Sequence, residues 1–182
     1  MKENNQHINQ LLARCKKSDK NAQMQIYKDY YRAMYNTALR ILKDEFEAED
    51  IMQEAFLTAF TKLDSFKGEV TFGAWLKRIV INKSLTQLKK NIRYREVKME
   101  VLSDHTDTVD DSINYSDLKT SKVLEKLNSL KDNYRVILTL NLIEGYDYEE
   151  ISQILAYSNE NVRTTISRAK KKLKQLLLLE TA

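Results

Sequence analysis

The chain has 182 residues, of which 42% are hydrophobic and 31% charged, and its formal net charge at neutral pH is +4. This composition is typical of a soluble protein that can bury a real core in one or two domains. It argues against membrane residence, because no stretch approaches the ~18 uninterrupted apolar residues of a membrane span. The first ten residues, MKENNQHINQ, lack the apolar run of a signal peptide, so we expect a cytoplasmic protein.

Residues that interrupt helices are scarce, with no proline and three glycines, whereas Leu, Lys, Glu, Gln and Ala are abundant. This predicts an all-α protein. The single cysteine, Cys15, excludes an internal disulfide. We expect it to pack as a small apolar side chain, because no histidine accompanies it.

Apolar periodicity predicts a first helical domain. Its helices are expected at about residues 8–17, 21–43, 46–63 and 72–91. Asp64, Ser65 and Gly68 interrupt the pattern before the last of these helices, and Thr71 is its candidate N-cap.

The third predicted helix contains EDIMQEAFLTAF, residues 49–60, which has two unlike faces. At 3.6 residues per turn, one broad side collects the apolar residues Ile51, Met52, Ala55, Phe56, Ala59 and Phe60. The opposite side carries Asp50, Gln53, Glu54 and Leu57, with no lysine among them. Such a set is compatible with catalytic acids, with metal ligands or with a patch shaped for another protein.

The residue inventory does not favour a catalytic or metal-binding role for Asp50 and Glu54. The chain has two histidines, His7 and His105, and no Glu-x-x-His motif. It also has no glycine-rich loop that would cradle phosphate. We therefore expect no cofactor, no metal and no enzymatic activity.

The helix predicted after Thr71 combines an aromatic-bearing loop with positive charge. Its expected buried stripe is Phe72, Trp75, Leu76 and Ile79. The residues beside this stripe that add charge or an amide are Arg78, Asn82 and Lys89, with Lys77, Lys83 and Lys90 nearby. Basic residues beside aromatic or amide groups suit single-stranded nucleic acid. Aromatic side chains are more often buried, so a core role for Phe72 and Trp75 is the alternative.

Between residues 94 and 117 the periodicity fades and carboxylates dominate. They are Glu96, Glu100, Asp104, Asp107, Asp110, Asp111 and Asp117. The only lysine among them is Lys98. This composition indicates an acidic flexible linker.

A second helical domain follows the linker. Its helices are predicted at residues 118–130, 134–144, 148–155 and 159–179, with Gly145 as a left-handed stop between the second and third. The last two helices are joined by a brief turn, which is typical of a helix-turn-helix. The turn has Ala156 and Tyr157 where such turns often carry glycine, and Ser158 or Asn159 can cap the final helix.

The final helix has an apolar stripe and a polar, basic exterior. The stripe is Val162, Ile166, Ala169 and Leu173. A recognition helix meets base edges with its N-terminal half. The candidates outside the stripe in this half are Arg163, Thr164, Ser167 and Arg168, and Thr165 is a weaker one. Lys170, Lys171, Lys172 and Lys174 continue as a positive strip suited to phosphates. The alternative is an ordinary helical hairpin with a solvated lysine face.

Three segments in this order resemble the extracytoplasmic function (ECF) family of sigma factors. They are AEDIMQEAFLTAF, FKGEVTFGAWLKRIVINKSL and YDYEEISQILAYSNENVRTTISRAKKKL. The resemblance covers about residues 8–178. It implies a region-2 domain over residues 8–93, an acidic linker over 94–117 and a region-4 domain over 118–178, without a region-3 domain.

The resemblance also implies which surfaces bind core RNA polymerase. In the family, region 2 docks on the β′ clamp helices through positions matched here by Asp50, Gln53 and Glu54, and Leu57 extends the patch. Acids there would pair with basic groups of the polymerase while Leu57 supplies apolar contact. A contact of the second domain with the β flap is implied as well.

Promoter DNA is the second partner that the resemblance implies. The family captures a flipped base of the −10 element with a loop matched by residues 66–72, and Asn82 occupies the matching position on the next helix. Arg78 and Lys83 suit phosphates. The region-4 helix reads the −35 element, which fits Arg163, Thr164, Ser167 and Arg168, with Lys171 on phosphate.

Two alternatives stay open for the acidic linker. The acidic linker either threads toward the polymerase active centre, mimicking nucleic acid, or is only a solvated tether.

The resemblance implies one further partner. Most family members are held inactive by an anti-sigma factor, so such a partner is expected too.

A protein of another class would be a self-sufficient duplex-binding regulator. In that case residues 118–178 bind DNA and residues 8–93 form a dimerisation or sensor module. This hypothesis does not explain why one chain has both the lysine-free stripe and a second basic helix.

Overall fold

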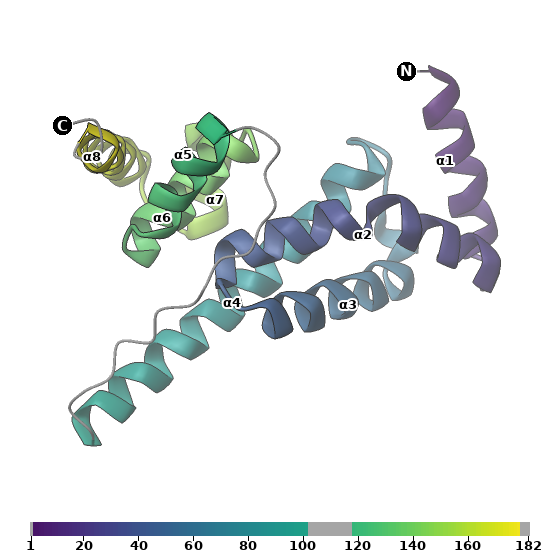
Figure 1. The fold of residues 1–182 in the computed structure, drawn as a ribbon. Coiled ribbons are helices and arrows are strands. Elements are labelled where there is room, and N and C mark those ends of the chain that lie inside the picture. The colour runs from purple at the N-terminus through teal and green to yellow at the C-terminus, as the bar shows by residue number, and fades with distance from the viewer. Residues whose placement is uncertain (1, 102–117, 179–182) are drawn as a thin grey trace. The chain divides into compact units, whose positions relative to one another are not determined.

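The computed structural model describes residues 2–101 and 118–178, and every regular element in these residues is helical (Figure 1). The chain divides into two compact units, Met1–Glu100 and Val101–Ala182. The predicted all-α class with two small helical domains is confirmed. Residues 102–117 of the predicted linker lie outside the described residues. Within the described ranges, no helix has both the length and the apolar character to cross a membrane.

The first unit contains four α-helices and a short 3₁₀ turn. They are α1 (Lys2–Cys15), α2 (Lys20–Leu42), α3 (Glu45–Thr61), η1 (Leu63–Ser65) and α4 (Phe72–Val101). Helices α2 and α3 lie side by side (Figure 1). The core between the helices is fully buried at Ile26, Ala38, Ile41, Ala48, Ala55, Ala59, Leu76, Val80 and Ile81.

Side-chain caps explain where three of these helices begin. The Asp19 carboxylate accepts hydrogen bonds from the backbone N–H groups of Asn21 and Ala22, at 2.9 and 3.1 Å. The Ala22 bond, followed by that from the Arg14 side chain, holds the pKa of Asp19 below its usual value. Asp44 caps α3 in the same way, and Thr71 Oγ1 accepts from the Ala74 N–H at 3.2 Å. The predicted N-cap at Thr71 is therefore confirmed.

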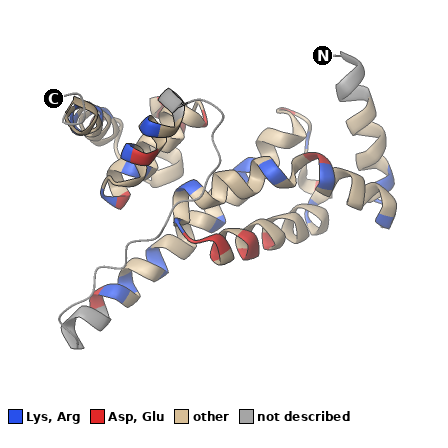
Figure 2. Cartoon of the chain, in the orientation of Figure 1, with Lys and Arg blue, Asp and Glu red and all other residues tan. Residues whose placement is uncertain are grey.

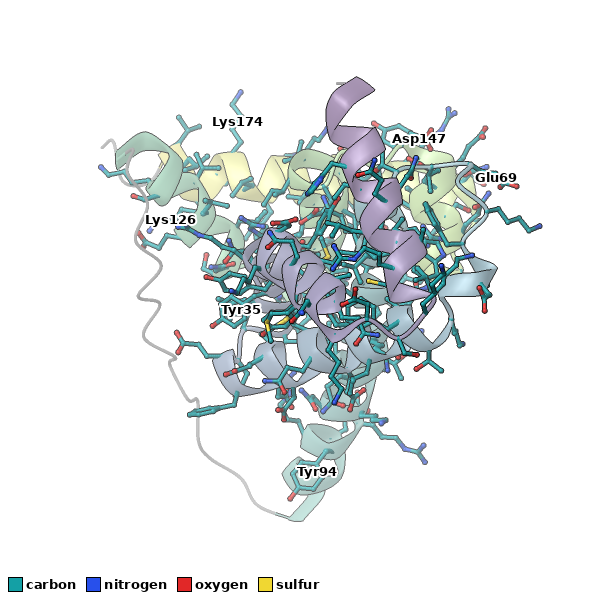
Figure 3. The ribbon with its side chains drawn as sticks, turned by 90° about the vertical axis from the view of Figure 1, so that its right-hand side faces the viewer. Tyr35, Glu69, Tyr94, Lys126, Asp147 and Lys174 are labelled. Carbon is teal, nitrogen blue, oxygen red and sulfur yellow. The ribbon has the colours of Figure 1, made fainter. Side chains whose placement is uncertain are left out.

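Helix α4 differs from its prediction in length and in its buried stripe. The expected end near Asn91 is wrong, because the helix continues to Val101 and includes the first residues of the predicted linker. Residues 93–96 are exposed, and Tyr94 is 70% exposed on this projecting part of the helix (Figures 1 and 3). Residues 93–96 have no buried side chain, so apolar periodicity could not reveal this part of the helix. The extension contains no Gly or Pro, and more than half of its residues are Arg, Glu, Lys or Met, which favour helices.

The buried stripe of α4 is broader than the one predicted. Phe72 and Leu76 are buried, at 3% and 0% exposure, but Trp75 and Ile79 are only half-buried. Val80 and Ile81 take the fully buried positions instead. Helix α4 has side-chain contacts with two helices, with α2 through Phe72 and Tyr30 and with α3 through Gln87 and Glu47.

The second unit contains four α-helices and one π-helical segment. They are α5 (Leu118–Asn128), α6 (Asp132–Leu138), η2 (Thr139–Ile143), α7 (Tyr148–Leu155) and α8 (Asn159–Leu178). Gly145 has φ +78°, as expected for a left-handed stop. The fully buried core comprises Ile137, Leu138, Leu140, Ile151, Val162 and Ala169.

Candidate functional site

Helix α3 has the two-faced character that its sequence predicts. Ile51, Met52, Ala55, Phe56 and Ala59 are buried, and Phe60 is half-buried. The opposite face is open to solvent: Asp50, Gln53 and Glu54 are exposed, and Leu57 is 67% exposed. Acidic residues gather on the first half of this helix, as the red segments of Figure 2 show. The predicted docking residues therefore share one accessible surface.

The docking face is not free of lysine once the fold is formed. Lys83 Nζ of α4 lies 3.0 Å from Glu54 Oε2, and the Lys83 side chain is 29% exposed against 60% for Glu54. Gln53 Nε2 donates to Glu49 Oε1 at 3.2 Å within α3. Glu54, predicted to bind polymerase, is thus paired with a residue predicted to bind DNA.

Phe46 is a surface residue that the sequence reasoning missed. Its side chain is 83% exposed, in the first turn of α3. Residues 46, 50, 53 and 57 follow a 4-3-4 spacing and therefore lie along one helical stripe. Phe46 and Leu57 place an apolar group at each end of the polar centre. That spacing is visible in the sequence, because Phe46 precedes Asp50 by four residues.

The residues predicted for the −10 element occupy α4 and the loop before it. Asn82 is exposed, whereas Arg78 and Lys83 are half-buried. In the loop, Glu69 is exposed and Val70 is 54% exposed (Figure 3).

The aromatic residues beside the loop form a cluster with one another. Phe66 lies 5.8 Å from Phe72 and 5.3 Å from Trp75 between ring centroids, and the Phe72–Trp75 distance is 5.8 Å. Tyr30 of α2 packs edge-on against Phe72 at 5.6 Å. A Cβ added to Gly73 would come within 2.8 Å of the Tyr30 ring, so this approach needs glycine. The core alternative is confirmed for Phe72, and Trp75 shares the cluster at intermediate exposure.

A shallow concavity of about 380 Å³ lies between α3 and α4. Its lining residues are Ile51, Glu54, Asn82, Lys83, Thr86, Gln87 and Lys90. The fold therefore brings Asn82 and Lys83 beside Glu54, although the two sets were predicted for different partners.

A hydrogen-bonded group fixes α4 against the beginning of α3. Glu47 Oε1 accepts from Gln87 Nε2 at 3.1 Å, and Glu47 Oε2 accepts from Asn91 Nδ2 at 2.6 Å. Gln87 Nε2 also donates to Asn91 Oδ1 at 3.1 Å. These partly buried bonds join residues that are 40 and 44 positions apart, and they set how α4 presents Asn82 and Lys83.

Helices α7 and α8 form the predicted helix-turn-helix. Ala156 ends α7 in the left-handed conformation, with φ 55° and ψ 42°. Ser158 Oγ accepts from the Asn161 N–H at 3.2 Å, so Ser158 rather than Asn159 caps α8.

Helix α8 buries the predicted stripe and exposes the predicted contact residues. Val162, Ile166, Ala169 and Leu173 are at most 6% exposed. The predicted contact residues Arg163, Thr164, Ser167, Arg168 and Lys171 are all exposed. Lys174 extends away from the helix (Figure 3). Thr165 is half-buried and its hydroxyl donates to Asn161 Oδ1 at 3.0 Å, which makes it a poorer candidate for DNA contact.

One contact of Arg163 was not predicted from the sequence. Its guanidinium carbon lies 5.9 Å from the centroid of the Tyr148 ring, within the range of a cation–π interaction. Tyr148 is the first residue of α7 and is half-buried.

Both units match known protein families. Residues 26–94 match Sigma-70 region 2, and residues 120–173 match Sigma-70, region 4. These matches place the two helical units in the sigma-70 class. Sigma factors are transcription initiation factors and not enzymes.

Individual relatives narrow this class further. The chain is 31% identical over 180 residues to the ECF RNA polymerase sigma factor SigW of Bacillus subtilis, covering 93% of this chain and 96% of SigW. It is 27% identical to the RNA polymerase sigma-H factor of Pseudomonas aeruginosa, with 92% of each chain covered. The chain belongs to the ECF family of RNA polymerase sigma factors.

A solved structure agrees with this assignment. The fold is similar to that of the sigma factor RpoE in its co-crystal with the anti-sigma factor NepR from Bartonella quintana, with a TM-score of 0.60 and 25% identity. The match covers 85% of this chain and 95% of RpoE.

Proposed function

We propose that this protein binds core RNA polymerase and directs promoter-specific initiation, reading a −35 duplex with its second unit and melting the −10 element with its first. The observation that carries the proposal is the outer face of α3. Carboxylates, an amide and a leucine stay in solvent there while the opposite face builds the core. In a self-sufficient duplex-binding regulator this exposed face would have no function.

The α3 face has the chemistry of a docking surface for a basic partner. Asp50, Gln53 and Glu54 form its polar centre and would pair with basic groups on the β′ clamp helices. Leu57 and Phe46 flank this centre and add apolar contact, which is where binding energy concentrates in interfaces. The acids would speed and orient the encounter, and the apolar ends would slow dissociation.

The outer side of α8 has the chemistry of a −35 reader. Arg163 and Arg168 can donate two hydrogen bonds each to a guanine edge in the major groove, and Thr164 and Ser167 can make shorter contacts. Lys171 lies further along the helix, where phosphate contact supplies affinity without sequence information. The second unit would meanwhile rest on the β flap of the polymerase.

The concavity between α3 and α4 has the chemistry of a single-strand site. Asn82 offers both a donor and an acceptor to the edge of an unpaired base. Arg78 and Lys83 would hold the strand through its phosphates, and the exposed loop residues Glu69 and Val70 shortly precede the same helix.

An anti-sigma factor is a further proposed partner. The fold resembles that of RpoE, which was crystallised with the anti-sigma factor NepR. Such a partner would cover the exposed faces of α3 and α8 in the cytoplasm and keep the protein from polymerase until a signal arrives.

Reversing charge on the α3 face tests the proposal directly. We expect Asp50→Lys with Glu54→Lys to abolish binding to purified core polymerase and promoter-dependent transcription, because two attractive pairs become repulsive. Binding is measured by co-purification with core enzyme, and helical content by circular dichroism. The double variant should keep its helical content, since both side chains are exposed.

A control double variant makes the same charge change elsewhere on the first unit. Asp29 and Asp64 are exposed carboxylates that belong to α2 and η1 rather than to α3, so Asp29→Lys with Asp64→Lys should leave polymerase binding near normal. Undiminished binding by the Asp50/Glu54 variant would refute the docking surface and favour a self-sufficient duplex-binding regulator.

A further inference from the structure

We propose, on the basis of the −35 role assigned to Arg163 above, that Tyr148 is a positioning residue whose ring holds the Arg163 guanidinium ready for a base pair. Tyr148 belongs to α7, the first helix of the helix-turn-helix, whereas Arg163 belongs to α8. The two side chains meet with 5.9 Å between the guanidinium carbon and the ring centroid. Specificity at this position would then depend on a residue outside the reading helix.

The ring is held in place by the start of α7. The Asp147 carboxylate accepts from the Glu150 N–H at 2.8 Å, and the Glu150 carboxylate accepts from the Asp147 N–H at 2.9 Å. This reciprocal capping box fixes the backbone on both sides of Tyr148, at Asp147 and at Glu150. The half-buried ring therefore offers a fixed platform to the exposed arginine.

Contact with the ring would leave the arginine able to read a base. Where a guanidinium lies flat over an aromatic ring, its five N–H donors point outward in its own plane. The donors can therefore still form a two-bond fork with guanine O6 and N7 while the side chain stays against Tyr148. An arginine without the platform must give up its rotamer freedom when DNA binds, and that loss opposes association.

Electrostatics near the ring favour the same role. Asp147, Glu149 and Glu150 surround Tyr148 in sequence, yet within residues 2–101 and 118–178 no ion pair joins Arg163 to a carboxylate. A base edge that binds the Arg163 guanidinium would therefore not have to break an ion pair of that residue.

The test measures the affinity of the holoenzyme, full chain plus core polymerase, for promoter fragments. The matched fragment carries a promoter mapped from the RNAs that accumulate when the protein is overproduced. The second fragment carries the same promoter with its −35 element scrambled. Tyr148→Leu should weaken binding to the matched fragment about two- to five-fold, the range of an exposed cation–π contact, and leave the scrambled fragment unchanged. Tyr148→Phe keeps the ring and should bind like the unaltered protein.

Double variants that combine Tyr148→Leu with a change at Arg163 distinguish a positioning role from general damage to the helix-turn-helix. Tyr148→Leu should have no further effect in an Arg163→Ala background, whereas it should keep its full effect in an Arg168→Ala background. Circular dichroism and thermal melting of each variant report whether the helix-turn-helix is intact.

Three results would overturn the inference. An equal loss in Tyr148→Phe would assign the effect to the hydroxyl, and an undiminished loss in the Arg163→Ala background would make Tyr148 independent of Arg163. If Arg163→Ala itself leaves the preference for the matched fragment unchanged, the −35 role of Arg163 fails, and the positioning role fails with it.

Discussion

Asn82 carries a hydrogen-bond donor and an acceptor on one exposed side chain, in a concavity that also holds Lys83. We expect Asn82→Ala to slow strand opening more than polymerase recruitment, because the variant loses contact with a base that is available only after melting. Permanganate reactivity of −10 thymines measures opening, and gel-shift affinity measures recruitment.

Thr86→Ala is the matched control for this variant. Thr86 is exposed one turn further along α4 and lines the same concavity, but its hydroxyl donates to the Asn82 backbone carbonyl at 2.9 Å. Its loss should leave permanganate reactivity near normal. Normal reactivity in Asn82→Ala as well would remove Asn82 from strand opening.

The arginines and lysines of α8 are expected to contribute differently to DNA binding. Arg163→Ala or Arg168→Ala should weaken binding to a matched −35 element by about 1–3 kcal/mol per lost base contact. Lys171→Ala should weaken all sequences alike and lower the slope of log affinity against log salt by about one. Titrations at several salt concentrations on matched and scrambled duplexes check both. Equal arginine losses on the two duplexes would show that Arg163 and Arg168 only hold phosphate.

At the scale of elements, the turn of the helix-turn-helix carries backbone strain. Ala156 sits at φ 55° and ψ 42°, a conformation that is unfavourable for residues with a Cβ and natural for glycine. We expect Ala156→Gly to raise the free energy of unfolding of the second unit by about 0.5–1 kcal/mol, after the larger chain entropy of glycine in the unfolded state is subtracted.

Chemical denaturation followed by circular dichroism measures this change. Ala169→Gly is the opposite control, because Ala169 is buried in the middle of α8 and should lose stability on the same substitution. A destabilised Ala156→Gly variant would show that the left-handed alanine is not strained in solution.

The sequence predicted most helices and the two faces of α3, because both follow from apolar side chains that recur at helical spacing. It did not predict the end of α4, since residues 93–96 are exposed and leave no apolar rhythm to detect. The buried stripe of α4 was also misplaced, because Val80 and Ile81 are buried only through packing of α4 against its neighbours.

The contacts of the candidate sites were less predictable than the helices. The Lys83–Glu54 pair spans 29 residues, and Tyr148 meets Arg163 across a turn, so both depend on how helices pack rather than on local pattern. The assignments of Asp50, Asn82 and Arg163 to particular partners stay predictions until the variants above are measured.

At the scale of the whole molecule, the net charge of +4 conceals a separation of signs. Acidic residues concentrate on the first half of α3, whereas α4 carries lysines and arginines (Figure 2). Helix α8 carries those of the other proposed DNA surface. Such local fields act over about 8–10 Å at physiological salt, so each surface attracts its partner largely independently of the total charge.

The Lys83–Glu54 pair is where these opposite surfaces meet. We expect Glu54→Gln to raise the affinity of the free chain for single-stranded −10 DNA, at most about five-fold, because an exposed ion pair is worth up to about 1 kcal/mol. Fluorescence anisotropy with a labelled non-template oligonucleotide measures the change, which should shrink as salt is added.

Glu49→Gln is the control for Glu54→Gln, because it removes an equal charge one turn earlier on α3 from a residue that hydrogen-bonds Gln53 rather than Lys83. A gain of the same size in both variants would mean that total charge, and not release of Lys83, governs binding. Adding Lys83→Ala to Glu54→Gln should abolish the gain.

If polymerase takes Glu54 and DNA takes Lys83, the two partners must help each other by one common factor, since binding free energies form a closed cycle. Arrival of the enzyme would release the lysine, and occupancy of the lysine by a strand would leave Glu54 free for the enzyme. An initiation factor with this coupling would bind unpaired DNA, such as that at replication forks and repair gaps, up to about five-fold more weakly when it is free than when it is bound to polymerase.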